Sequence, residues 1–484
     1  MRLTTIDAYE PRPGRVVEFV PAGGARAAAA AAPPSPVPPS FNQRFHLAGS
    51  VGNWLGCAFD LPAGGPVGTG RLREVFEGWV RRHGTLRSGF RAGGERFLVP
   101  VEAVGLRVVA AGDFTDAGEL RRWLAGRLEA GCGRWGWPSY VLCAVLRDDG
   151  ATVVCGFDHA HVDACSLAVV VHELREGYAG RALRGGGGPA GGPGPRVTGS
   201  FVDYCALEQA NAAAAPPPDR SDPRLRGWAS FFAACGGTTP SFPLELGGAA
   251  PQGTDVRQLL DAEGAARWEE RCRSGGGSAF SGLLTAFGLA ARRSGAGEVL
   301  RMCVPLHTRD EERWERAVGW FTTVAPVTVG VRGVRSAAEG AGRTREDFRR
   351  AVRVAALPAA RALEALSASG EFRRTKDDVF MVSYVDYRRL PGSAAHAACR
   401  AHHISGVTVA DDAQFWLSRT HEGLFLRSRW PGTAAGGAVV TGFADAVEAE
   451  VAAGAGAPAA PAKGPPPEIT GADVRIHSPG DVRG

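Results

Sequence analysis

The sequence predicts a mixed α/β fold organised in two domains. Runs of β-branched and apolar residues, which suit buried strands, alternate along the chain with stretches whose apolar residues recur at helical spacing. At 484 residues the chain is long enough for two domains with substantial cores. A Gly- and Pro-rich stretch predicts a flexible linker at 181–199. We therefore expect an N-terminal domain over 1–180, a C-terminal domain over 200–451 and a disordered tail over 452–484.

The composition argues against several classes of protein. Lys and Arg (55) nearly match Asp and Glu (50) and are spread throughout, so the net charge of +5 does not indicate a nucleic-acid surface. The 10 cysteines lie singly, without a CxxC pair, and indicate buried thiols in a reducing compartment. The N-terminus lacks an apolar signal core, and no run of about 18 apolar residues predicts a transmembrane segment. We expect a soluble, cytoplasmic protein.

The first part of the chain predicts one strand followed by helices. The strand is expected at 16–20, and the Ala- and Pro-rich stretch at 21–40 predicts a flexible surface insertion. A helix begins at Arg71 and ends before Gly84, and another covers 123–128. The helix at Arg71 presents one apolar face, made by Leu72, Val75, Phe76, Trp79 and Val80.

A hairpin and the helix after it frame the most informative stretch. A buried strand is expected at 140–146, and Asp149-Gly150 is a turn signal that predicts an antiparallel partner at 152–157. A helix over 166–178 follows. The loop between this second strand and the helix is crowded with polar residues, namely Asp158, His159, His161 and Asp163.

The second half of the chain also mixes helices and strands. Ser278 is placed to cap an apolar helix that runs to Ala291. Further strands are expected at 299–305, 318–327 and 379–390, and a terminal hairpin at 415–429 around Glu422-Gly423.

The residue types of the polar loop leave three interpretations open. In the first, a strand ends and its polar residues meet water. In the second, His159, His161 and Asp163 alternate, so that on an extended chain they point to one side and bind a metal ion. This spacing resembles the HxHxDH signature of metallo-β-lactamase-like hydrolases, but Ala164 stands where that signature has its last histidine. The third interpretation is a catalytic motif, which needs support from elsewhere in the chain.

That support comes from a series of landmarks. The heptapeptide DHAHVDA at 158–164 resembles the HHxxxDG signature of the condensation-domain and chloramphenicol-acetyltransferase-like superfamily. Other matches occur before and after it, in the order that the superfamily has. They are RHxxLRxxF at 82–90, the SYxDY and WxxYW helices at 200–204 and 226–232, VGxFxNxxP at 318–327, and at 379–390 the segment by which the second domain crosses back to the first. Together they look most like the stand-alone polyketide-associated acyltransferases.

The resemblance implies two similar lobes with a substrate tunnel between them. It implies an acyltransferase of lipid biosynthesis or secondary metabolism that moves an acyl group from a thioester to a hydroxyl of a sugar, lipid or natural product. The co-substrate is then acyl-coenzyme A or an acyl-phosphopantetheine carrier, with an acyl or peptidyl carrier protein as partner and no permanently bound cofactor or metal. Two alternatives stay open: a free-standing condensation enzyme that forms an amide with an amine acceptor, and a non-catalytic condensation-like recruitment module.

The resemblance also implies roles for the site residues. His159, in the second motif position, is the general base, because a hydroxyl must lose its proton as it attacks the thioester. Asp163 holds the loop by pairing with an arginine, for which Arg309 is the candidate and Arg87 the alternative. His83, in the RHxxLRxxF match, is interpreted as a helix-end or core histidine.

This sequence departs from the motifs at three positions. Asp158 replaces the first motif histidine and is expected to orient His159 or His161. Ala164 replaces the motif glycine, which matters if that position needs a positive φ. Thr323 replaces the asparagine of VGxFxNxxP. The supporting or tunnel-lining candidates are Asp158, His161, Arg309, Trp320, Thr323 and Ser383.

Overall fold

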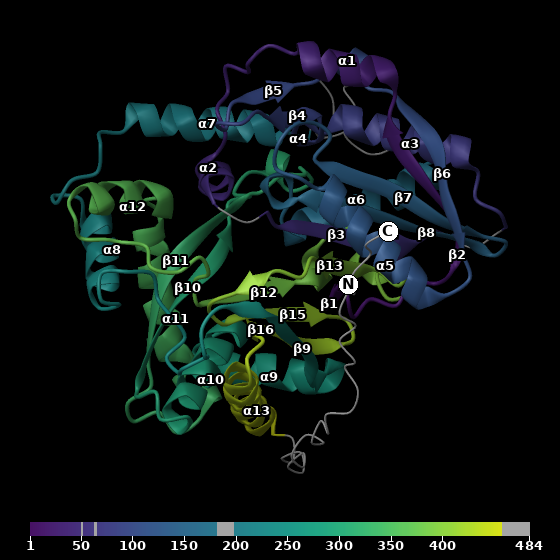
Figure 1. Cartoon of the computed structure of the whole chain (residues 1–484). Helices are drawn as coiled ribbons and strands as arrows, with labels where there is room; N and C mark the ends of the chain where they lie inside the picture. Colours follow the sequence, from purple (N-terminus) through teal and green to yellow (C-terminus); the bar gives the residue numbers. More distant parts are fainter. Residues whose placement is uncertain (50–51, 62–64, 182–197, 457–484) are drawn as a thin grey trace, which may run out of the picture.

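A computed structural model describes residues 1–49, 52–61, 65–181 and 198–456. Two β-sheets, each covered by helices, form two lobes that lie against each other (Figure 1). Purple and blue mark most of the N-terminal lobe, and teal, green and yellow most of the C-terminal lobe. The predicted mixed α/β fold is confirmed. Most of the predicted linker, 182–197, and of the predicted tail, 457–484, lies outside the described residues.

The central strand of the first sheet is β8 (Gly150–Asp158), and every one of its residues is buried. It pairs antiparallel with β7 (Tyr140–Arg147), which confirms the predicted hairpin, and on its other side with β3 (Trp54–Asp60). The strand order of the sheet is β1 (Arg2–Thr5), β13 (His402–Ser405), β3, β8, β7, β2 (Gly14–Pro21) and β6 (Leu106–Phe114).

Helices cover both faces of this sheet. Because successive side chains of a strand point to opposite faces, Phe157 and Val154 of β8 belong to different cores. Phe157 packs with residues of α3 (Thr69–Arg82) and α6 (Ala164–Tyr178), and Val154 with residues of α5 (Ala117–Gly131). The shorter elements of this lobe are α1 (Gly23–Ala31), α2 (Phe41–Ala48), α4 (Gly84–Arg87), β4 (Ser88–Phe90) and β5 (Arg96–Leu98).

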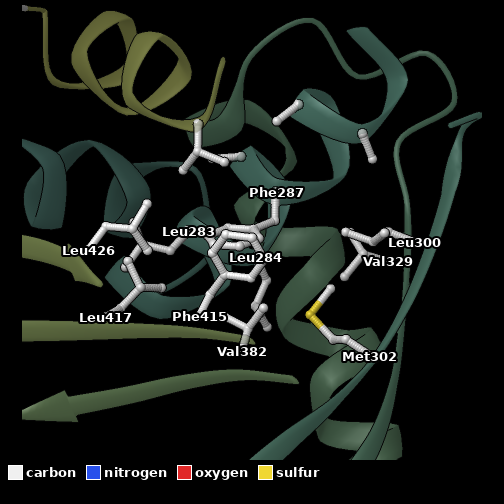
Figure 2. Packing of buried hydrophobic residues seen from close by; sticks show 14 of the residues in the cluster. Leu283, Leu284, Phe287, Leu300, Met302, Val329, Val382, Phe415, Leu417 and Leu426 are labelled. Carbon is white, nitrogen blue, oxygen red and sulfur yellow. The ribbon is translucent and has the colours of Figure 1, made fainter. Parts of the chain in front are cut away.

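The core of the second lobe forms around α10 (Ala279–Arg293). Ser278 caps this helix as predicted, since its hydroxyl accepts a hydrogen bond from the backbone N–H of Ser281. The ring of Phe287 lies 5.2 Å from that of Phe415 on the sheet, and Figure 2 shows the leucines of α10 packed over neighbouring strand residues. Burial of this apolar face holds the helix on the sheet.

Helices also surround the second sheet, although α7 (Phe201–Ala214) lies against α4 of the first lobe. Its strand order is β11 (Thr322–Gly330), β10 (Val299–His307), β12 (Met381–Asp386), β15 (Gln414–Thr420), β16 (Gly423–Pro431), β9 (Ala250–Asp261) and β14 (Val409–Ala410). The helices are α7 (Phe201–Ala214), α8 (Pro223–Ala233), α9 (Ala262–Ser274), α11 (Ala337–Ala355), α12 (Ala359–Ala368) and α13 (Ala434–Ala455).

Two segments that were expected to be flexible contain packed helix. The predicted insertion at 21–40 forms α1, in which Ala25 and Ala29 are buried. Alanine has the highest helix propensity, and its small side chain lets the helix approach the N-terminal core closely. The tail predicted from 452 is wrong over its first residues, because α13 continues to Ala455, which is also buried.

The chain returns to the first lobe late, which corrects the predicted C-terminal domain over 200–451. β13 inserts between β1 and β3, parallel to the first and antiparallel to the second. The segment at 379–390, expected to make this crossing, stays in the second sheet as β12, although Tyr387 beyond its end packs into the first core. Pairing between strands so far apart in the chain produces no local sequence pattern from which it could be predicted.

Candidate functional site

The central strand of the first sheet ends in a short turn that leads directly into α6. A 3₁₀ turn covers His159–His161 between the two elements. A carboxylate fixes each end of it: Asp158 accepts from the N–H of Ala160 at 3.0 Å, and Asp163 accepts from the N–H of Ser166 at 2.7 Å. The predicted loop between strand and helix is confirmed, and both its ends are anchored on buried elements.

His159 has the geometry of a neutral base. Its Nδ1 lies 3.0 Å from the carbonyl oxygen of Val162, and because a carbonyl only accepts, this nitrogen carries the proton. Nε2 therefore keeps its lone pair. Burial, followed by the charge of His46, lowers the pKa of His159. The imidazole, whose centroid lies 4.3 Å from the ring of Trp320, is thus uncharged and able to accept a proton at neutral pH.

Asp163 and Arg309 form a two-point ion pair that joins the lobes. The two terminal nitrogens of Arg309 lie 2.6 and 3.1 Å from the two carboxylate oxygens of Asp163. Asp163 also accepts from the N–H of Phe321 at 3.0 Å, and the guanidinium lies 4.3 Å from the centre of the Phe321 ring. Arg309 is thus the partner of Asp163, as predicted. Arg87, the alternative, donates instead to the carbonyl of Val99 at 3.0 Å.

Ser166 extends this ion pair and was missed by sequence reasoning. Its Oγ accepts from Arg309 Nη2 at 2.9 Å and from the N–H of Gly319 at 3.0 Å. Gly319 sits against Phe201, with no room for a side chain, which explains the glycine of the VGxF match. The first turn of α6 therefore holds the segment that carries Trp320, next to His159.

Asp158 does not contact either motif histidine, so the prediction that it orients one of them directly is wrong. Its two oxygens lie 3.2 and 3.1 Å from Nε2 of His46, a residue of α2. Burial raises the pKa of Asp158, but the hydrogen bond and charge of His46 outweigh burial and hold it below its usual value. Asp158 is therefore an anion with a specific imidazole partner.

His161 supports the loop from the opposite side. Its Nδ1 lies 3.0 Å from the carbonyl oxygen of Thr85, and its side chain is buried. Burial lowers the pKa of His161 to about 4, so the ring is neutral at physiological pH. His83 is likewise a core histidine, as interpreted, with Nε2 2.6 Å from the carboxylate of Glu173.

The helix that supplies His46 was missed because its start signal lies beside the Ala- and Pro-rich stretch. α2 begins with a capping box: Ser40 accepts from the N–H of Gln43, and the Gln43 side chain accepts from the N–H of Ser40. The spacing S-x-x-Q could have revealed it. Gln43 also donates to the carbonyl of Ala160 at 2.7 Å, which ties α2 to the 3₁₀ turn at His159–His161.

Replacing Gln43 with alanine is expected to lower the free energy of unfolding by about 1–3 kcal/mol. The side chain is fully buried, and its loss leaves the Ala160 carbonyl without this donor and removes one of the acceptors of the Arg96 guanidinium. Urea denaturation checks this effect. Asn211→Ala, at an exposed position of α7, is the matched control, and equal stability of both variants would contradict the prediction.

The remaining candidates lie on strands of the second sheet. Thr323 pairs with Leu306 in β10, and Ser383 pairs with Trp416 in β15. Thr323 replaces the motif asparagine, but the side-chain amide of Asn42 in α2 lies beside it, because Asn42 donates to the carbonyl of Thr322. Trp320 is the member of this group that contacts His159; no contact of Thr323 or Ser383 with that ring is seen in the described part of the chain.

Ala164 fits its position without strain. It is the first residue of α6, and Arg400 is the non-glycine residue with a positive φ in the described segments. The motif glycine is therefore not needed here for backbone reasons.

The two other interpretations of the polar loop lose their basis. The side chains are not at the surface, since Asp158 is 0% and Asp163 7% exposed. Both carboxylates are occupied by His46 and Arg309. Within residues 1–49, 52–61, 65–181 and 198–456, no group of three or more His, Cys, Asp or Glu is arranged to hold a metal ion.

The chain is similar to curated mycobacterial acyltransferases. It is 27% identical over 383 residues to acyltransferase PapA3 of Mycobacterium tuberculosis, covering 75% of this chain and 77% of the relative. It is 28% identical over 346 residues to trehalose-2-sulfate acyltransferase PapA2 of Mycobacterium bovis, covering 68% and 70%. No family model matches the chain.

Solved structures share the fold over nearly the whole chain. A PapA2 acyl transferase superimposes with a TM-score of 0.82 at 23% identity, covering 94% of this chain and 100% of that one. The condensation domain of the Monacolin K polyketide synthase MokA gives a TM-score of 0.64 at 15% identity, covering 87% and 98%. The two-lobed arrangement is thus common to both kinds of protein.

Proposed function

We propose that the chain, an acyltransferase that shares its fold with PapA2 and with condensation domains, moves an acyl group from a thioester onto a hydroxyl, with His159 as the general base. The observation that carries this proposal is the Nδ1 contact of His159 with the Val162 carbonyl, at 3.0 Å. That contact leaves Nε2 as a proton acceptor on a neutral ring.

The chemistry follows from one proton transfer. Nε2 of His159 takes the proton of the acceptor hydroxyl as its oxygen attacks the thioester carbon. The carbon–sulfur bond then breaks, the ester remains on the acceptor, and the thiolate leaves with the proton returned by the imidazolium. The pKa of His159, lowered mainly by burial, keeps the ring in its accepting form before the attack.

The residues of the proposed site lie at the junction of the two lobes. Asp163 on α6 and Arg309 from the second half meet there, and Trp320 lies over the ring of His159. We assign Asp163 and Arg309 a positioning role, because the carboxylate also holds the N–H groups of Ser166 and Phe321. The substrate tunnel between the lobes stays a prediction.

The acceptor we propose is a sugar hydroxyl, and the donor an acyl-coenzyme A or an acyl carrier protein. The support is the similarity to two curated proteins, one named a trehalose-2-sulfate acyltransferase and one a 2'-acyl-2-O-sulfo-trehalose (hydroxy)phthioceranyltransferase. The described residues contain no helix long and apolar enough to cross a membrane. A cytoplasmic location stays a prediction from the isolated cysteines.

Mass spectrometry of reaction products tests the proposal. Purified protein is incubated with palmitoyl-coenzyme A and trehalose, and in parallel with an amine acceptor such as glucosamine. We expect release of free coenzyme A and a product heavier than trehalose by one acyl group, both dependent on His159. An amide product only would favour the condensation-enzyme alternative, and ester formation that persists in His159→Ala would overturn the role of the base.

A further inference from the structure

The turn that carries His159 contacts a second imidazole, that of His46, which the proposed reaction does not use. His46 faces the end of β8, with Nε2 3.1 and 3.2 Å from the carboxylate oxygens of Asp158. The carboxylate side chain is 0% exposed and the imidazole 9%. A buried carboxylate is costly unless it is paired, so the contact with His46 offsets the cost of burying Asp158.

The two imidazoles and one indole form a compact group. The centroid of His46 lies 6.3 Å from that of His159 and 5.8 Å from that of Trp320, while His159 and Trp320 are 4.3 Å apart. No solvent layer fits between rings at these separations. A charge on one imidazole therefore acts on the other through a medium of low polarity.

We propose that His46 is a positioning residue of the active site: anchored on Asp158, its imidazolium places a positive charge beside His159 and keeps that ring in its neutral, proton-accepting form. The inference rests on the proposed role of His159 as the base. It assigns a purpose to the motif's altered first position, where Asp158 holds an imidazole contributed by another helix.

The other charged groups around His159 do not compete with this effect. Asp163 and Arg309 neutralise each other in their ion pair. Burial lowers the pKa of His161 to about 4 and that of His403 on β13 to about 3, so both rings are neutral at physiological pH. The charges left to act on His159 are those of His46 and Asp158. The charge of His46 lowers the pKa of His159 more than the carboxylate of Asp158 raises it.

The sign of the expected pH effect follows from this. A cation beside His159 disfavours a second cation, so the base stays neutral down to a lower pH. When the cation is removed, His159 holds its proton to a higher pH, and the acidic limb of the kcat/KM profile moves upward. Two unit charges about 6 Å apart in a medium of moderate polarity move that limb by about one to two pH units.

Charge-changing variants of His46 test the inference. His46→Gln is expected to move the acidic limb upward and to recover most of its rate at high pH, whereas His46→Lys, which keeps the cation, leaves the limb near that of the wild type. Asp158→Asn keeps the oxygen that caps Ala160 but no longer favours a charged His46, so it moves the limb in the same direction by a smaller amount. Equal limbs in the Gln and Lys variants, or an unmoved limb in Asp158→Asn, would overturn the inference.

A direct titration separates this inference from the proposed function. NMR of protein labelled with 15N-histidine follows the ring of His159, identified by its loss in His159→Gln, whether or not acyl transfer occurs. An upward shift in His46→Gln supports the inference even without activity, and an unchanged titration refutes it even in an active enzyme. His83→Gln is the matched control, because His83 is also a buried histidine paired with a carboxylate, Glu173, and its loss should leave the titration of His159 in place.

Discussion

Replacing His159 with alanine is expected to lower the rate of acyl transfer by about 10²–10⁴-fold while the protein stays folded. The acceptor hydroxyl then loses its base, whereas the fold loses one hydrogen bond, to Val162, and the ring contacts with Trp320 and His46. One such hydrogen bond contributes about 1 kcal/mol to stability. Steady-state rates of thioester cleavage and urea denaturation of the same preparation measure the two effects separately.

His421→Ala is the control for this experiment. His421 is an exposed histidine in the turn between β15 and β16, far along the sequence from His159, and its loss should leave both rate and stability unchanged. A His159→Ala variant that is folded and as active as the wild type would remove His159 from the mechanism. A variant that is inactive because it is unfolded would show a structural role instead.

Replacing Asp163 with alanine is expected to lower the free energy of unfolding by about 3–5 kcal/mol and to remove most of the activity. The side chain of Arg309 is 6% exposed, so its guanidinium would become a buried charge without its carboxylate. The N–H groups of Ser166 and Phe321 would lose their acceptor as well. The turn that presents His159 and the segment that presents Trp320 would then no longer be held together.

Two further variants separate charge from packing in this network. Asp163→Asn keeps an oxygen for the N–H of Ser166 and is expected to be more stable than Asp163→Ala. The double variant Asp163→Ala/Arg309→Met is expected to lose less stability than the sum of the single changes, because it leaves no unpaired charge. Asp445→Ala, which removes a 55% exposed carboxylate paired with Arg257, is the surface control and should change stability by at most about 1 kcal/mol. Strict additivity, or a loss in Asp163→Ala as small as in this control, would contradict a structural role for the pair.

Local features of the fold were predictable where local physics decides them. The hairpin of β7 and β8 follows from two apolar runs around a turn signal, and α10 from an apolar helix with Ser278 at its start. The failures have local causes as well. Alanine-rich sequence at 21–40 indicated flexibility by composition, yet its helix propensity and a nearby core to pack on produce α1.

The sequence by itself determined the turn between β8 and α6. A buried strand, a short polar segment and an apolar helix are consecutive in the chain, so His159 and Asp163 reach their places through local structure. Their proposed roles came from the family resemblance, as did the choice of Arg309. Arg309 does pair with Asp163, at 2.6 Å, so the resemblance predicted a contact between two segments that are far apart in the chain.

Only the tertiary structure decided the partners that lie far away in the chain. His46 stands 112 positions from Asp158, and Ser166 stands 153 from Gly319. β13 joins the first sheet from beyond residue 400, next to a strand that begins at Arg2. Such contacts depend on how separate apolar faces pack, and the packing free energy belongs to the assembled core, not to any short stretch. The sequence therefore places His159 and Asp163 beside each other, while only the fold brings His46 and Arg309 to them.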